Sequence, residues 1–347
     1  MERFNKIINV LNFPTDIPIL NEKYINDIEF NKNIHLDIHP PQYIIDLDFK
    51  EVNFPYTTND ITNFKGLAYT QPFKILSQKG IETLRIIISK NTNILKQNER
   101  NNSIRGLGYI SKFVRDFSYS PNLINLFSNI SNKPIALHNC YMNISQINFG
   151  KIGVNKAVDE WHTDSVDYVM VLVLSDTTDM VGGDLQVLQI ADANGRTFDQ
   201  LKKTNIPKHL IKNIKFPSPG YCIFMQGSLI LHSVTSVVSA NEPRISLINS
   251  FIDRNVFSKD NTKLSTFRDQ SKDPENIANL EFARHISWRV IGQLCYIFEN
   301  MNYSRDNTKD ISDIFNNAIY ELNKSEKIIT KKNPSDLQGF IKIKSKL

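Results

Sequence analysis

The chain has 347 residues, of which 41% are hydrophobic and 22% are charged, so it contains enough apolar material to bury a sizeable core. Its formal net charge of +5 is the balance of 41 basic and 36 acidic residues. Basic residues are concentrated only over residues 324–346, so the sequence does not predict a nucleic-acid-binding surface. No apolar run reaches the roughly 18 residues of a membrane span, and no apolar signal segment follows Met1.

The cysteines bear on the cellular compartment. Cys140, Cys222 and Cys295 are far apart, odd in number and without C-x-x-C spacing. This usage indicates neither a disulfide framework nor a structural zinc site, and it is typical of a reducing compartment. We therefore expect a cytoplasmic protein that is neither exported nor inserted in a membrane.

In the amino-terminal third of the chain, the predicted secondary structure changes from strands to helices near residue 75. Residues 1–75 contain six prolines and predict short strands joined by loops, as in the alternating Tyr43–Phe49. Apolar residues then recur with helical spacing over residues 80–98 and 110–129. We expect these two stretches to form a helical layer packed on one face of a sheet.

From about residue 135 the pattern becomes that of strands. Polar and apolar residues alternate over residues 141–148, which predicts a strand with one buried face. Apolar residues are nearly continuous over residues 168–174, which predicts a strand covered on both faces. A turn at Gly182-Gly183 then leads into a further strand over residues 184–190.

Three more segments complete the pattern. A polar excursion over about residues 191–215 precedes a strand at residues 220–225. Gln226-Gly227 then predicts a hairpin turn into the strand that contains His232. After residue 255 the apolar spacing becomes helical again, which predicts a helical extension.

The segment Trp161-His162-Thr163-Asp164-Ser165 carries the strongest chemical pattern. Residues i and i+2 of a strand point to one face, so His162 and Asp164 can grip the same metal ion. His232, in a distant strand-like run, supplies a second imidazole. Two histidines and one carboxylate on one octahedral face leave three positions open, which suits non-haem Fe(II) oxygen chemistry.

A second i and i+2 pair lies in the apolar segment that begins at Arg244. A guanidinium fork with the neighbouring hydroxyl of Ser246 suits the far carboxylate of a dicarboxylic acid. We therefore hypothesise that 2-oxoglutarate is the cosubstrate.

Each of these residues has a simpler interpretation when it is taken alone. A His-x-Asp pair is often a hydrogen-bonded surface pair, His232 alone would be a structural histidine, and Arg244 alone would be an ion-pair partner. Their order along strand-like segments, with a Gly-Gly turn between, favours the joint functional interpretation.

Many short strands, with metal ligands on separated ones, predict an α+β protein with a double-stranded β-helix of the jelly-roll type. We expect one domain over residues 1–347. It would comprise amino-terminal strands and helices over 1–134, the jelly-roll core over 135–255, and a carboxyl-terminal helical extension over 256–347.

Over about residues 135–255 the chain resembles the Fe(II) and 2-oxoglutarate-dependent dioxygenases. A narrower resemblance is to a fungal and bacterial branch that oxidises small amino acids and includes aziridine-forming enzymes. The residues that carry the resemblance are Trp161 to Val169, Leu174 to Thr178, Gly182 to Asp184, Gly220, Gln226, Gly227, His232 and Glu242 to Ile245.

This resemblance implies that His162, Asp164 and His232 bind iron and that Arg244 with Ser246 binds 2-oxoglutarate. Fe(II), 2-oxoglutarate and O2 would be required. Halogenating relatives replace the carboxylate ligand with a small residue, so Asp164 implies hydroxylation, desaturation or ring closure and not chlorination.

Further site residues are expected around these five. Asn143 and Tyr141 would hydrogen-bond the oxoacid. The competing explanation is structural, with both residues in a buried row of polar side chains whose hydrogen bonds are satisfied within the protein. Arg105 or Arg115 would bind a substrate carboxylate, although most arginines simply solvate a surface.

Trp161 and Ser165 flank the ligands and would shape the entrance to the site. His138 and His285 are expected to be structural. The substrate is expected to be a small polar metabolite, most simply an amino acid or its derivative, and no nucleic acid or membrane partner is expected. The flanking helices would either cap the barrel mouth or form a homodimer interface.

Three other classes stay open. An oxidase of the isopenicillin-forming kind shares the Arg-x-Ser pair but needs no oxoacid, so succinate production separates the two. A non-catalytic metal-binding jelly-roll protein would keep the fold without turnover. A nucleic-acid or protein demethylase would share the metal chemistry but usually shows a concentrated basic or aromatic surface.

Overall fold

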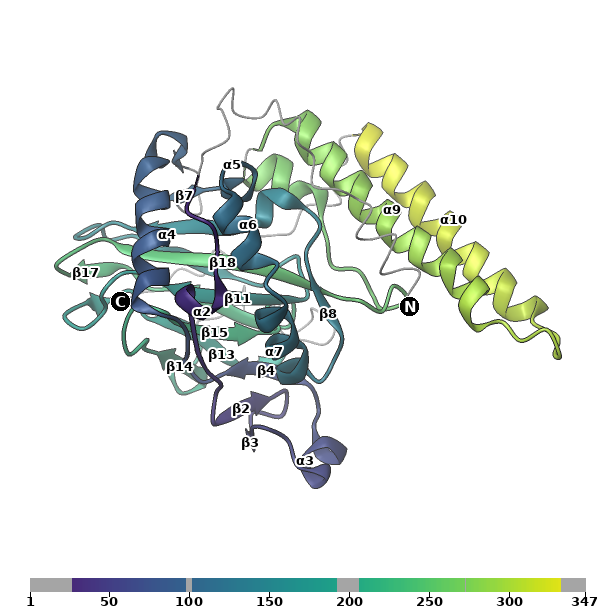
Figure 1. Ribbon diagram of the computed structural model, residues 1–347, viewed down its shortest axis with the longest axis horizontal. Helices are drawn as coiled ribbons and strands as arrows, with labels where there is room; N and C mark the ends of the chain where they lie inside the picture. Colours follow the sequence, from purple (N-terminus) through teal and green to yellow (C-terminus); the bar gives the residue numbers. More distant parts are fainter. Residues whose placement is uncertain (1–26, 98–101, 192–205, 272, 332–347) are drawn as a thin grey trace. The chain divides into compact units, whose positions relative to one another are not determined.

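The computed structural model describes residues 27–97, 102–191, 206–271 and 273–331. The chain divides into two compact units, one of residues 23–253 with 339–347 and one of residues 1–22 with 254–338. The larger unit combines strands and helices, and the described part of the smaller unit is helical (Figure 1). The expectation of a single domain stays a prediction. Within the described residues, no helix is long and apolar enough to cross a membrane.

The larger unit is built on a twelve-stranded sheet whose strands pair in antiparallel fashion. Four neighbouring strands form its centre, in the order β15 (Tyr221–Met225), β11 (Tyr168–Val173), β18 (Arg244–Asp253) and β9 (Gln146–Gly150). The sheet is extended by β4 (Leu67–Thr70), β2 (Tyr43–Asp46) and β3 (Glu51–Asn53) beyond β15, and by β7 (Asn102–Ile104) and β6 (Lys96–Gln97) beyond β9. Off this path lie β1 (Leu36–His39), β5 (Phe73–Leu76) and β8 (Ile135–Leu137).

A smaller sheet has four strands, in the order β10 (Asp159–His162), β16 (Ile230–Val234), β13 (Leu185–Ala191) and β14 (Ile211–Ile214). A further pair is formed by β12 (Val181–Gly182) and β17 (Val237–Ser239). From β9 to β18 the chain passes repeatedly between the two main sheets, because β9, β11, β15 and β18 belong to the large one and β10, β13, β14 and β16 to the small one. The structure is therefore a mixed α and β protein with large antiparallel sheets.

The main core lies between the two sheets. Val169, Val171 and Val173, which share one face of β11, pack in one cluster with Val187 and Val234 of the small sheet. All of these side chains are buried. The core therefore joins the inner faces of both sheets, and residues on those faces point toward one another.

Helices cover the outer face of the large sheet (Figure 1). Phe127 of α7 (Pro121–Ser131) lies against Phe224 and Phe251, with ring centroids 4.6 and 5.2 Å apart. In α6 (Lys112–Ser118), Ser118 hydrogen-bonds Asn249 of β18. The same layer contains α4 (Gln78–Lys90) and α5 (Leu107–Ile110), and the short helices α2 (Lys32–His35) and α3 (Thr58–Asn63) complete the unit. The prediction of a helical layer on one sheet face is confirmed.

Two local predictions were wrong. Residues 141–148 are not one strand, because Tyr141–Asn143 forms a 3-10 turn and Ser145 has a φ of 50°, so β9 begins only at Gln146. The Ser145 amide donates to the Asn249 side chain, 2.7 Å away, which holds this break in place. Gln226-Gly227 is not a hairpin turn, because the strands on either side of it belong to different sheets.

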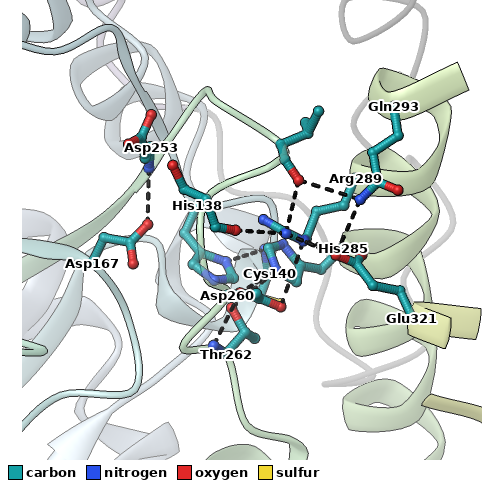
Figure 2. A network of polar contacts seen from close by, with 12 residues as sticks. His138, Cys140, Asp167, Asp253, Asp260, Thr262, His285, Arg289, Gln293 and Glu321 are labelled. Carbon is teal, nitrogen blue, oxygen red and sulfur yellow. Dashed lines mark hydrogen bonds and ion pairs between the residues drawn. The ribbon is translucent and has the colours of Figure 1, made fainter. Parts of the chain in front are cut away.

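The described part of the smaller unit consists mainly of α9 (Glu275–Asn300) and α10 (Thr308–Lys331), preceded by a π-helical turn at Thr266–Gln270. Arg289 of α9 forms an ion pair with Glu321 of α10, 2.8 Å away, and donates to the carbonyls of Val256 and Ser258 (Figure 2). His285 is buried and hydrogen-bonds Asp260 at 3.0 Å.

The pKa of Asp260 reflects this network. Burial alone would raise the pKa, but the charge and hydrogen bond of His285 and the charge of Arg289 outweigh burial and hold it well below its ordinary value of 3.8. The carboxylate therefore stabilises the folded unit at neutral pH.

Asp260→Asn should lower the free energy of unfolding of this unit by about 3 kcal/mol at neutral pH, because a buried ion pair loses one partner. The folded-state pKa is depressed, so the contribution is present above about pH 4 and is lost as the pH falls below that value. The difference between wild type and variant should therefore shrink on acidification. Urea unfolding followed by Trp288 fluorescence in a Trp161→Phe background measures it, and a pH-independent difference would contradict the assignment.

Candidate metal centre

Three side chains from separate parts of the larger unit converge on one point. His162 at the end of β10 lies opposite His232 of β16, and their ring centroids are 4.2 Å apart. Asp164 Oδ1 lies 3.4 Å from His162 Nε2, and its Oδ2 lies 3.5 Å from His232 Nε2. One potential ligand atom from each residue lies within 4.8 Å of the others, and no other such group of histidine, cysteine or carboxylate occurs in the described part of the chain. The arrangement matches a three-ligand metal site.

Both imidazoles are set in the tautomer that a metal needs. His162 Nδ1 lies 2.5 Å from the Glu160 carbonyl, and His232 Nδ1 lies 2.9 Å from the Ile230 carbonyl. A carbonyl only accepts, so each Nδ1 carries a proton, and in a neutral ring this leaves the lone pair on Nε2. Burial, together with the neighbouring His162, lowers the pKa of His232 to about 4, so this ring is neutral at neutral pH.

Asp164 is held outside the strand by Gly227. Strand β10 ends at His162, so the expected i and i+2 strand geometry does not extend to Asp164. Instead the Asp164 amide donates to the Gly227 carbonyl, 2.9 Å away. A Cβ at position 227 would lie 2.1 Å from Asp164 Oδ2, so only glycine leaves room for the carboxylate. Gly227 was missed as a functional residue, because its role depends on a contact across 63 residues.

Arg244 begins β18 and is 1% exposed. Its Nε donates to the Gly183 carbonyl and its Nη1 donates to Ser246 Oγ, each at 2.9 Å. Its Nη2 is buried and has no hydrogen-bond partner among the residues that the structure describes. Such a buried donor costs free energy until it meets an acceptor, so it is well suited to contact a ligand.

The charge on Arg244 is retained despite its burial. Burial lowers the pKa of Arg244 to about 10, and the negative charges of Asp159 and Asp184 oppose this effect. The guanidinium therefore stays protonated at neutral pH. Asp159 also approaches the metal centre, because its Oδ1 lies 3.7 Å from His162 Nδ1. Asp159 thus links the surroundings of Arg244 to those of the triad.

Arg244 and Ser246 belong to a longer row of polar side chains on β18, β9 and the segment after β7. Ser246 lies opposite Asn148, and Gln146 Nε2 donates to Asn148 Oδ1 at 2.8 Å. Gln146 Oε1 in turn accepts from Arg105 Nη1 at 2.5 Å. We call this set the polar row; its members are Arg244, Ser246, Asn148, Gln146, Arg105 and Asn143, the last of which accepts from Arg105 Nη2 at 3.1 Å.

The polar row faces the same inner space as the triad. Gln146 lies opposite Ile248 on β18, and Ile248 packs against the core cluster that contains Val187. Val187 lies opposite His232 in the small sheet. Directly opposite residues of an antiparallel pair project to one face, so Gln146 and His232 both point between the sheets.

The remaining candidates lie elsewhere. Tyr141 is buried against Tyr109, with ring centroids 6.0 Å apart. Trp161 occupies the face of β10 opposite to His162 and packs with Leu188 and Leu231. A binding role for either residue stays a prediction.

Arg115 and Ser165 also stay predictions. Arg115 donates to the backbone carbonyls of Gly108 and Tyr109, which ties α6 to α5. Ser165 is buried next to the ligand Asp164 in sequence, at 6% exposure. Gln146 and Asn148 were not predicted, because the break at Ser145 changes which residues of this segment share a face.

Comparison with known proteins gives no matching family model and no matching curated protein sequence. Solved structures are similar over part of the chain. The non-heme alpha ketoglutarate dependent carbocyclase SnoK from nogalamycin biosynthesis is 10% identical, with 57% of this chain and 85% of that chain covered and a TM-score of 0.43. HygX from Streptomyces hygroscopicus, with nickel and 2-oxoglutarate bound, is 11% identical, with 59% and 89% covered and a TM-score of 0.41. EctD from S. alaskensis, with 2-oxoglutarate and 5-hydroxyectoine, is 15% identical, with 62% and 84% covered and a TM-score of 0.42.

His162→Ala, Asp164→Ala and His232→Ala should each weaken binding of Fe(II) or Ni²⁺ by more than about 100-fold, since each removes one of three ligands. Anaerobic calorimetry measures the affinity, and circular dichroism checks that the fold is kept. His209→Ala removes an exposed histidine outside the triad and is the control. Metal affinity equal to that of wild type in a triad variant would remove that residue from the ligand set.

Gly227→Ala should weaken metal binding about 10-fold to 100-fold, as expected for a residue that orients a ligand. The φ of Gly227 lies outside the left-handed region, so the backbone accepts alanine, and the atoms closest to the added methyl group all belong to the Asp164 side chain. In an Asp164→Ala background the same substitution should lower the melting temperature of the metal-free protein much less, because the carboxylate is gone and only the Asp164 Cβ contact at 3.1 Å is left. An equal loss of stability in both backgrounds would show that Gly227 acts on the fold and not on Asp164.

Proposed function

We propose that the protein is a non-haem Fe(II) and 2-oxoglutarate-dependent oxygenase that oxidises an unactivated C–H bond of a small metabolite. The observation that carries this proposal is the pairing of two features on the inner faces of the sheets. One is the His162, Asp164 and His232 triad, and the other is a buried, charged Arg244 with an unused donor.

The strand order supports a double-stranded β-helix as the scaffold. Of the ten strands described between residues 146 and 253, eight are divided equally between the large and the small sheet, and the chain passes repeatedly from one sheet to the other. In a jelly roll this arrangement closes two sheets over an interior that can hold a ligand. The triad lies on the small sheet and the following turn, and Arg244 lies on the large one.

The donor set fits a divalent iron ion. Two imidazoles and one carboxylate would provide three ligands and leave three positions for the oxoacid and oxygen. Fe(II) bound there would supply the redox chemistry that couples decarboxylation of 2-oxoglutarate to succinate and CO2 with oxidation of the substrate. His162 and His232 would present Nε2, because their Nδ1 protons are committed to backbone carbonyls. Asp164 would supply one negative charge, in a position that Gly227 keeps clear.

Arg244 would bind the distal carboxylate of 2-oxoglutarate. Its Nε and Nη1 are used by Gly183 and Ser246, which fix the plane of the guanidinium. Nη2 then remains to donate to a carboxylate oxygen, with Ser246 Oγ beside it. A charged donor in a buried site gives a strong and directional contact for an anion.

We further propose that the product arises by hydroxylation, desaturation or ring closure, because Asp164 fills the position of the carboxylate ligand. The proposed substrate is an amino acid or a derivative, the proposed location is the cytoplasm, and neither a nucleic acid nor a membrane is a proposed partner. A homodimer through the flanking helices is kept as part of this proposal.

A 2-oxoglutarate-independent iron oxidase is the second candidate, because the unused Arg244 donor would serve a substrate carboxylate equally well. Succinate separates the two functions. Purified protein is loaded anaerobically with Fe(II) and 2-oxoglutarate and then exposed to oxygen with free amino acids. Production of succinate supports the oxygenase, whereas oxidised substrate without succinate supports the oxidase.

Arg244→Ala should raise the 2-oxoglutarate concentration needed for half-maximal succinate formation by about 30-fold to 1000-fold, since loss of a buried charge-assisted contact costs roughly 2 to 4 kcal/mol. Ser246→Ala removes a neutral hydroxyl and should cost only about 3-fold to 10-fold. If Arg244→Ala leaves the 2-oxoglutarate requirement unchanged but abolishes substrate binding, the clamp belongs to the substrate.

A further inference from the structure

A second carboxylate lies on the inner face of the small sheet. Asp159 begins β10, is 5% exposed and lies opposite Val234, which packs in the core cluster between the sheets. Directly opposite residues project to one face, so Asp159 points between the sheets. The register is irregular between Asp159 and His162, where β10 contains one residue more than β16. This extra residue brings two side chains that are three positions apart onto the same face.

The Asp159 carboxylate acts on the metal centre through its charge. Its Oδ1 lies 3.7 Å from His162 Nδ1, which is beyond an ordinary hydrogen bond, and that Nδ1 already donates to the Glu160 carbonyl. Burial lowers the pKa of His232, and the Asp159 charge is one of the effects that oppose burial. A metal bound by both rings would therefore lie within range of a negative charge that does not belong to the triad.

The same carboxylate acts on Arg244. A Cβ at Gly150 would lie 2.7 Å from Val158 Cγ2 and 3.1 Å from Arg244 Cβ, so the residue before Asp159 lies beside the start of the arginine side chain. Burial lowers the pKa of Arg244, and the Asp159 charge is the largest of the effects that oppose it. Arg244 Nη2 has no hydrogen-bond partner in the described part of the chain, so Asp159 acts on it through space.

One charge near both parts of the site affects their two ligands in opposite ways. A carboxylate attracts a divalent cation at the triad and repels an anion at Arg244. The Coulomb contributions of separate charges add, so this effect does not depend on which further groups contact Asp159. Burial strengthens the effect, because little water is present to screen the charges.

We infer that Asp159 tunes both binding steps of the site: its carboxylate strengthens binding of the divalent metal and weakens binding of a dicarboxylate at Arg244. The inference rests on the proposed function for the identity of the two ligands, and it adds a residue that contacts neither. In the metal-free protein Asp159 would balance the Arg244 charge, so dicarboxylates would be held weakly. A divalent cation at the triad would offset the repulsion.

Asp159→Asn tests the charge, because it keeps the size and shape of the side chain. Asp159→Ser is a second variant, since it removes the charge with a smaller side chain and so introduces no clash. Asp184→Asn is the matched control. The Asp184 charge acts on Arg244, as the Asp159 charge does. The carboxylates that act on His232, in contrast, are Asp164 and Asp159.

Anaerobic calorimetry measures Fe(II) binding, and calorimetry of the metal-free protein with glutarate measures binding at Arg244. Glutarate has the length of 2-oxoglutarate but lacks the keto oxygen that would chelate a metal. Asp159→Asn and Asp159→Ser should bind Fe(II) at least about tenfold more weakly and glutarate at least about tenfold more tightly. Asp184→Asn should tighten glutarate binding and change the Fe(II) affinity by less than about threefold. Damage to the fold, which circular dichroism detects, would weaken binding of both ligands.

The inference fails if either affinity is unchanged in the Asp159 variants, or if both ligands bind more weakly. It also fails if Asp184→Asn weakens Fe(II) binding as much as Asp159→Asn does. Arg244→Ala in the Asp159→Asn background should abolish the gain in glutarate affinity, and a gain that persists would overturn the inference, because glutarate would then bind elsewhere. Opposite shifts without any 2-oxoglutarate-dependent succinate from the wild type would support the role of Asp159 and overturn the proposed function.

Discussion

The antiparallel register between β10 and β16 is the constraint on which the site depends. It places His162 opposite His232 with ring centroids 4.2 Å apart. Two imidazoles at this distance cannot both be protonated at low cost in a buried place, and burial keeps His232 neutral. Backbone carbonyls take both Nδ1 protons, so the two lone pairs and the Asp164 carboxylate meet at one point. The site is thus organised by main-chain geometry before any ligand arrives.

The opposite wall of the interior is organised by buried charge. Arg244 and Arg105 bring two guanidiniums onto the inner face of the large sheet, and a line of neutral polar side chains joins them. The Gly183 carbonyl and the Ser246 hydroxyl hold the Arg244 fork in a fixed plane and leave its Nη2 for an incoming acceptor. In the proposed function this wall would bind anions, whereas the triad would bind the metal. Anion binding and redox chemistry would then lie on different sheets.

The outer layers make these walls rigid. Phe127, Phe224 and Phe251 lock α7 onto the back of the large sheet, so β15 and β18 cannot shift without breaking aromatic contacts. Arg85 of α4 pairs with Glu242, whose carboxylate also accepts from the Asp176 amide at 2.7 Å. The Arg85 hydrogen bond, against the opposing effect of burial, lowers the pKa of Glu242, so this tie holds at neutral pH just before β18 begins at Arg244.

Local sequence determined the parts of this protein that depend on neighbouring residues, and tertiary structure decided the rest. The helical layer and the buried strand β11 follow from apolar spacing, and the order of His162, Asp164, His232 and Arg244 already indicated the chemistry. The strand β9 begins only after Ser145 because the Ser145 amide donates to the distant Asn249. The chain crosses from the large sheet to the small one after Gln226, and this crossing depends on which sheet each strand joins. The contact of Gly227 with Asp164 and the union of Arg105 with Gln146 likewise join residues that are far apart in sequence. Periodicity carries no information on such pairings, because strand register is set by the packing of two faces against each other.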